Sequence, residues 1–146
     1  MTAFRSGTDL ILGVVKEVNK VPTFFPLGYS TGCKISDSTE TGQRKTKESE
    51  DSNWNVKYVK SLSETITADG FVYDSVAASS ISFPNLKSLW INKTPVTLRY
   101  KYRDQSANAG LYQGTFIITS LENDGQAGDD EKWSVTFENS GAVVPV

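Results

Sequence analysis

The side chains that most often carry out enzyme chemistry are scarce in this sequence. It contains no histidine, the commonest general base and metal ligand, and only one cysteine, Cys33. A nucleophilic serine or cysteine would therefore depend on lysine, aspartate or glutamate as its base. The sequence has no GxSxG, P-loop or dinucleotide-binding motif. A pair of carboxylates of the glycosidase kind stays open. We predict a protein that is not an enzyme and that needs no cofactor or metal.

Two clusters of charged residues could bind ions. The acidic cluster consists of Asp124, Asp129, Asp130 and Glu131. It lacks the ligand spacing and the central glycine of an EF-hand loop, so a solvated loop is a better interpretation than a calcium site. The basic cluster consists of Arg99, Lys101 and Arg103. A stripe of this kind could follow a phosphate backbone, but it is more often the solvent face of a strand or a partner for acids across a subunit contact.

A polar segment at residues 41–53 separates two strand-like regions. It has no apolar residue between Gly42 and Trp54, and six of its residues are charged: Arg44, Lys45, Lys47, Glu48, Glu50 and Asp51. Such a segment cannot bury itself, so it predicts a protruding loop or hairpin arm. Its first half is basic and its second half is acidic. The six charged residues are therefore our candidates for contacts between subunits, the basic half of one arm meeting an acidic surface on another copy.

The clearest pattern of elements lies between Ser82 and Glu122. Phe83, Leu86, Leu89 and Trp90 follow helical spacing and predict a helix at about residues 83–92, which Ser80 or Ser82 can cap and Asn92 can end in a left-handed conformation. The period then changes to two, which predicts paired strands at residues 94–103 and 112–122. The residues that we expect to anchor the core are Leu86, Trp90, Leu98, Phe116 and Trp133. Trp90 is predicted to be buried between the helix and this hairpin.

Length and composition are those of one domain. The chain has 146 residues, 38% of them hydrophobic, and a formal charge of −2. We expect residues 1–146 to form a single domain, neither nucleic-acid binding by net charge nor anchored in a membrane. The N-terminus lacks the pattern of a secretion signal. Seven or eight strands and one helix predict a mainly β fold, an antiparallel β-sandwich or partly closed barrel with one flanking helix. The sandwich and the barrel both stay open.

The order of the strand patterns resembles a known family. GTDLILGV near the start is followed by LGYSTGCKISDSTETGQRKTKES, and a tryptophan strand then leads into SLSETITADGFV. The second half contains NKTPVTLRYKY, YQGTFIITSLE and the closing WSVTFENSGAVVP. In this order the chain is similar, over nearly its whole length, to the major tail tube proteins of bacteriophages with long non-contractile tails, whose fold is related to the tube of the type VI secretion system.

The resemblance implies a structural role rather than a reaction. It implies a subunit of the virion tail, made in the cytoplasm of the host bacterium, that assembles into stacked hexameric rings around a channel for DNA. The implied partners are other copies of the chain and tail proteins such as the tape measure and the tail terminator, and DNA would pass without sequence-specific binding. The arm at 41–53 would then be mobile in the free subunit and ordered in the tube, and an ordinary solvated loop stays open as the alternative. The alternative is a carbohydrate- or protein-binding β-sandwich, with a carboxylate hydrolase well behind.

Overall fold

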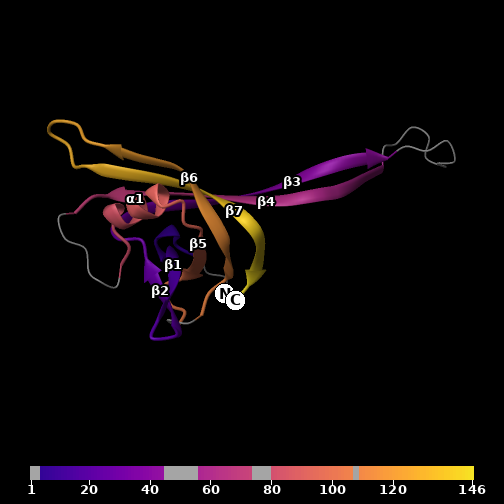
Figure 1. Ribbon diagram of the computed structural model, residues 1–146, viewed down its shortest axis with the longest axis horizontal. Coiled ribbons are helices and arrows are strands. Elements are labelled where there is room, and N and C mark those ends of the chain that lie inside the picture. Colours follow the sequence, from indigo (N-terminus) through magenta and orange to yellow (C-terminus); the bar gives the residue numbers. More distant parts are fainter. Residues whose placement is uncertain (1–3, 45–55, 74–79, 107–108) are drawn as a thin grey trace.

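The computed structural model describes residues 4–44, 56–73, 80–106 and 109–146. The elements of this part of the chain are η1 Gly7–Asp9, β1 Leu10–Val18, β2 Val21–Pro26, β3 Ser30–Arg44, β4 Val56–Phe71, α1 Phe83–Ile91, β5 Val96–Tyr102, β6 Tyr112–Asp124 and β7 Lys132–Pro145. The strands form one antiparallel sheet in the order β2-β1-β5-β6-β7-β4-β3, which does not close into a barrel (Figure 1). The predicted mainly β fold with one flanking helix is confirmed. Among the described residues, no helix is long and apolar enough to cross a membrane.

The sheet bends in its middle, so its two ends face each other. The pairing of β6 with β7 shifts register between Gly114 and Phe116 and again between Ile118 and Ser120. Irregularities of this kind bend a strand and increase its twist. Figure 1 shows β6 and β7 curving downward, with β1, β2 and β5 below the long strands. The bend brings β5 under β4, where the Tyr100 hydroxyl lies 3.4 Å from Oε1 of Glu64.

The core fills the space inside this bend. Its largest fully buried side chains are Phe116, Phe137, Ile66, Leu86, Leu98, Val14 and Val135. Trp133 is also buried, and its indole nitrogen donates to the carbonyl of Phe71 at 3.0 Å, so the polar end of the ring is satisfied. Four of the five residues expected to anchor the core, Leu86, Leu98, Phe116 and Trp133, therefore lie in it.

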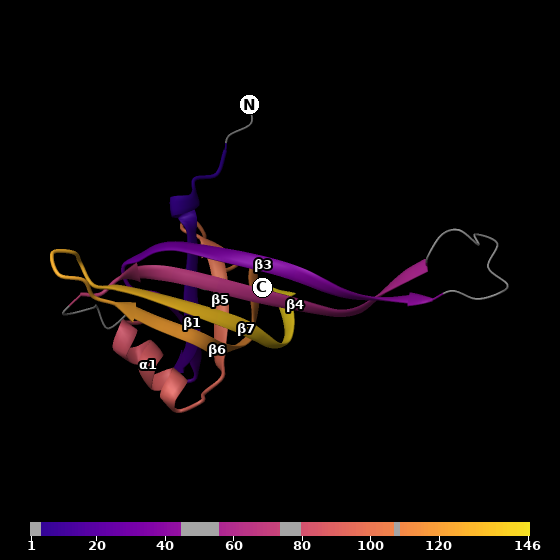
Figure 2. The same cartoon turned by 90° about the horizontal axis from the view of Figure 1, so that it is seen from above.

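The fifth, Trp90, lies elsewhere. Helix α1 spans Phe83–Ile91 and lies against β6 (Figure 2). Leu86 is buried, but the Trp90 side chain is 46% exposed. The prediction that it is buried is wrong. Helical spacing predicts the direction in which a side chain points, but it does not predict whether another element lies there. The last turn of α1 lies beside a groove of about 540 Å³, which Ile117 and Ile118 of β6 line.

The capping of α1 also differs in part from the prediction. Ser82 is the N-cap residue, but its side chain makes no capping hydrogen bond, and Pro84 occupies the first turn. Asn92 keeps a right-handed helical conformation (φ −80°). The left-handed residue is Lys93, with φ 55°, so the left-handed position that follows the helix comes one residue later than we predicted, although the helix itself ends at Ile91.

A long two-stranded hairpin projects from the body of the molecule. β3 and β4 pair without interruption from Thr41 and Val59 out to Arg44 and Val56, and Figures 1 and 2 show both strands extending far beyond the rest of the sheet. No third strand pairs with this outer part among the residues that the structure describes. The part of the predicted arm at residues 45–53 lies outside the described residues.

Candidate functional site

The outer hairpin carries apolar side chains that the subunit does not cover. Val56, Val59 and Leu62 of β4 are all exposed, Leu62 at 71%. These three aliphatic side chains lie within seven residues of one strand, and exposed apolar groups at this density can form a contact with another protein. The hairpin is therefore a candidate contact surface through its apolar residues as well as its charges.

Of the six charged residues proposed for contacts between subunits, one is described. Arg44 is exposed at the end of β3, and its guanidinium carbon lies 4.5 Å from the centroid of the Tyr58 ring. The other five, Lys45, Lys47, Glu48, Glu50 and Asp51, lie outside the described residues. Their role between subunits stays a prediction.

Both ends of the sheet are open edges in the described part of the chain. β2 pairs only with β1, and β3 pairs only with β4. An edge strand presents unpaired N–H and C=O groups that can pair with a strand of another chain. β3 is the longer edge, with 15 residues, most of them polar and exposed. The β3 edge can thus be extended by a second copy, whereas β2 is the poorer edge because Pro22 and Pro26 lack an N–H group and the Pro26 carbonyl accepts from Ile81.

The basic stripe is not a solvent face. Arg99 and Lys101 are buried, which corrects that interpretation. Arg99 donates from Nε and from a terminal nitrogen to Oε1 of Gln113 on β6, at 2.9 and 2.6 Å. Lys101 lies over the ring of Phe24 on β2 and donates to the carbonyl of Ser106 at 3.2 Å. Acceptors and apolar cover from other segments thus hold these side chains within the subunit, so we assign them no phosphate-binding role.

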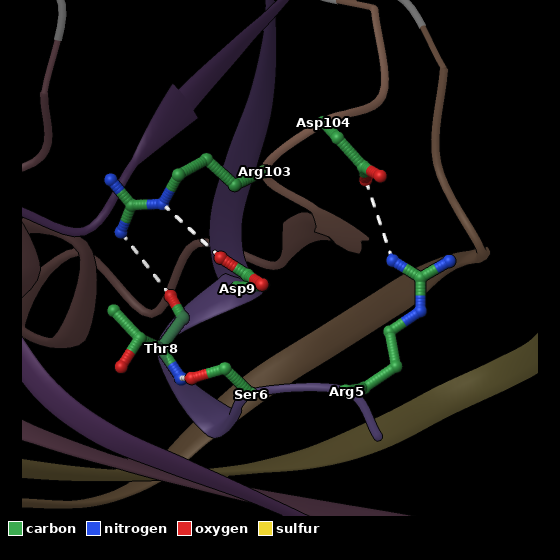
Figure 3. Close-up of polar contacts among 6 residues, drawn as sticks. All are labelled: Arg5, Ser6, Thr8, Asp9, Arg103 and Asp104. Atoms are coloured by element: carbon green, nitrogen blue, oxygen red, sulfur yellow. Dashed lines mark hydrogen bonds and ion pairs between the residues drawn. The ribbon is translucent and has the colours of Figure 1, made fainter. Parts of the chain in front are cut away.

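The third residue of the stripe, Arg103, binds the start of the chain. Its Nε lies 3.9 Å from Oδ1 of Asp9, and a terminal nitrogen donates to the carbonyl of Thr8 at 3.2 Å (Figure 3). Arg5 makes a similar contact, 3.5 Å long, with Asp104. Both ion pairs are exposed, and each therefore contributes only about 0–1 kcal/mol. Together they place the segment before β1 against the end of β5.

The other residues singled out in the sequence form no reactive group. Burial, and then the charge of Asp69, raise the pKa of the Cys33 thiol, the opposite of what an activated nucleophile needs. In the acidic loop, Glu131 accepts a hydrogen bond from Asn123 at 2.6 Å. Among the described residues, no three histidine, cysteine or acidic side chains come together as a metal site.

Sequence reasoning missed a buried carboxyl group on β4. Glu64 is 6% exposed, and its Oε1 accepts the hydrogen bond from Tyr100 on β5. Burial, with the Asp37 carboxyl nearby, raises the pKa of Glu64 to about 7. Burial and the charge of Glu64 raise the pKa of Tyr100 in turn. The sequence could have indicated this burial, because Glu64 lies two residues before Ile66 and four before Ala68 and so shares the buried face of the strand with them.

These features belong to a recognised family. Residues 5–145 match the phage tail tube protein family. The match covers far more than half of the chain, so the chain belongs to this family of structural proteins of the virion tail. The family resemblance inferred from the strand patterns is confirmed. No curated protein matches the sequence.

Solved structures of tails share the fold. The tail of an empty gene transfer agent particle, refined with C6 symmetry, is 17% identical, covers 98% of this chain and 99% of its own, and has a TM-score of 0.76. A chain in the virion of the native gene transfer agent particle is 18% identical to this chain and has a TM-score of 0.73. The match again covers 98% of this chain and 99% of the other. The SPP1 tail tube is 12% identical, covers 97% of this chain and 79% of its own, and has a TM-score of 0.59. At these identities the likeness establishes the fold.

Proposed function

We propose that this chain is the repeating subunit of a phage tail tube, which assembles into stacked hexameric rings around a channel for DNA. The observation that carries the proposal is the family match over residues 5–145. The likeness to a tail refined with C6 symmetry, over 98% of this chain, supports six subunits in a ring. The role is structural rather than catalytic.

The sheet edges support assembly into rings. A contact in which one edge of a subunit meets a different surface of the next is head-to-tail, and it closes into a ring when the rotation is a whole fraction of a turn. β3 is an open edge at one end of the sheet, so each copy can present this edge to a different surface of the next copy. Closing the ring removes the unpaired backbone groups that an isolated subunit leaves exposed.

The projecting hairpin supports stacking of one ring on the next. It reaches beyond the body of the subunit (Figure 1), so it can contact a copy outside its own ring. Its exposed Val56, Val59 and Leu62 would be removed from water by that contact. Burying apolar side chains stabilises an interface by about 25 cal/mol per Å².

The channel would pass DNA without holding it. Dense lysine and arginine contacts retain a duplex, and the chain has 15 basic against 17 acidic residues. Arg99 and Lys101 are bound inside the subunit, which removes two cations from any lumen surface. We further propose that the tape measure and tail terminator proteins bind this tube at its interior and its end.

The hairpin contact is tested by Val59→Ser. The exposed position predicts a change in subunit stability within about 0.5 kcal/mol but a clear loss of assembly in sedimentation and negative-stain microscopy of concentrated protein. Val18→Ser, which changes an exposed valine near the β1–β2 turn, is the matched control. If Val59→Ser assembles as well as the control, this exposed apolar residue of the hairpin has no part in stacking.

A further inference from the structure

A cavity lies where the β3–β4 hairpin leaves the body of the subunit. Its volume is about 780 Å³, and its wall is made by residues from β3, β4, β5, β6 and β7. Glu64 lines it and is buried, with Oε1 bound to Tyr100. Oε2 of Glu64 has no hydrogen-bond partner among the residues that the structure describes. Buried polar atoms are nearly always paired, so Oε2 is left to pair either with the Asp37 carboxyl, whose side-chain hydrogen bond to Glu64 helps to raise the pKa of Glu64, or with a group from outside the subunit.

The charges around this cavity favour a positively charged group as the outside partner. Asp37 lines the same cavity, and none of the residues that form its wall is lysine or arginine. Two carboxyl groups thus share a partly enclosed space without a counter-charge. The raised pKa of Glu64 follows from this environment, since burial and the neighbouring Asp37 both disfavour its ionised form. A cation placed between them would favour the ionised form of both carboxyl groups and so offset these effects.

The shape of the cavity selects a long side chain rather than a bare ion. Leu62, Tyr112 and Val143 give the wall apolar surface next to the carboxyl groups. Lysine and arginine bury an aliphatic stem along such surface while the charged end binds acids. A bound calcium ion would need six to eight oxygens at about 2.3–2.6 Å, and two carboxyl groups in a space of about 780 Å³ do not provide that enclosure.

We propose that this cavity is a socket for a basic side chain of a second copy of the chain, and that Arg44 is that side chain. The proposal rests on the proposed assembly into a tube and names one of its contacts. Arg44 is exposed at the outer end of the hairpin that has the socket at its base. The seven residue steps from Asp37 to Arg44 span roughly 23 Å of strand.

This placement suits repeated stacking. A socket and a basic side chain on one hairpin cannot reach each other, but two copies displaced along the hairpin can bring them together. Each copy then fills the socket of the next and offers its own socket to the previous one, which is the head-to-tail arrangement that continues without limit. An arginine bound by carboxylates in a partly dry site forms short charge-assisted hydrogen bonds, so the contact also fixes the register of stacking.

The test compares Glu64→Gln, Arg44→Gln and the double variant with the wild type. The readouts are the melting temperature of the free subunit and the lowest concentration that gives tubes in sedimentation and electron microscopy. We expect each single variant to raise that concentration by about tenfold or more, and the double variant to be no worse than either single one. Lys60→Gln, a change of an exposed base that pairs with Glu40 on the same hairpin, is the control and should shift it by less than about twofold.

Two measurements on Glu64→Gln, the melting temperature and the assembly, distinguish a contact between subunits from a purely structural role within one subunit. Glu64→Gln removes a buried charge, so the melting temperature of the free subunit should stay the same or rise while assembly falls. Tubes of Glu64→Gln at the wild-type concentration would overturn the socket and leave the proposed function intact. Additive effects of the two single changes would overturn the assignment of Arg44. Tubes that dissolve in EDTA would show a metal ion in place of the side chain. A wild type that never forms tubes refutes the proposed function itself, and the socket with it.

Discussion

The free subunit should carry a pH-dependent stability that one carboxyl group explains. Glu64 has a pKa of about 7 in the folded chain in place of the usual 4.5, chiefly because it is buried. The folded state therefore holds a proton that the unfolded chain releases between these values. The stabilisation of the folded state by protonated Glu64 is fully present below about pH 4.5 and is lost as the pH rises through about 7.

The size of this effect follows from the same shift. The difference between the two pKa values of Glu64 corresponds to at most ~3 kcal/mol of unfolding free energy at pH 8. Because the cavity beside Glu64 admits solvent, we expect about 1–2 kcal/mol. Glu64→Gln cannot ionise, so it should be more stable than the wild type by that amount at pH 8 and nearly equal to it at pH 4.5. The groups that face Glu64 are Asp37 on β3, Tyr100 on β5 and Tyr112 on β6, and they are unchanged in the comparison.

The assay is urea unfolding of dilute subunit at several pH values between 4.5 and 8. Glu17→Gln, which changes an exposed glutamate on β1, is the control and should track the wild type throughout. A difference between Glu64→Gln and wild type that stays constant over this range would refute the reasoning, because only a titrating group produces a difference that grows with pH.

Two further predictions concern helix α1 and the outer hairpin. Trp90→Ala should cost only about 1–2 kcal/mol of unfolding free energy because the ring is half exposed, whereas Leu86→Ala should cost about 2–5 kcal/mol; equal losses in urea unfolding would contradict the observed packing. Deletion of residues 43–52 should leave the melting temperature near that of the wild type but prevent tubes of normal length in electron micrographs. Tubes of wild-type length from the shortened chain would remove the arm from stacking.

Local sequence patterns were sufficient to predict the elements that depend mainly on residues close together in the chain. The helix at Phe83–Ile91 follows from apolar spacing and from Pro84 in its first turn, and β5 follows from strict alternation. Trp90 shows the limit of this reasoning. Its spacing gives the direction of the side chain on the helix, but the groove beside the last turn is made by β6, more than twenty residues later in the chain.

The candidate site depends on residues that are distant in the sequence. Alternation alone makes Lys101 a surface residue, and only the placement of Phe24 and Ser106 shows that it is covered. In the same way, Glu64 and Tyr100 meet because irregular pairing of β6 with β7 bends the sheet. No pattern within one strand encodes that meeting. The family resemblance could be recognised from sequence because it rests on the order of the strands rather than on their contacts.

The arrangement of subunits in the assembled particle is the most direct test of the proposed function. Polymerised protein should be imaged by cryo-electron microscopy, and end views should be averaged without imposed symmetry. We expect rings of six subunits stacked around an open channel, with the β3–β4 hairpin of each subunit reaching a neighbouring ring. Particles without six-fold symmetry, or a protein that stays monomeric at every concentration and beside preformed tail ends, would contradict a tube-forming role.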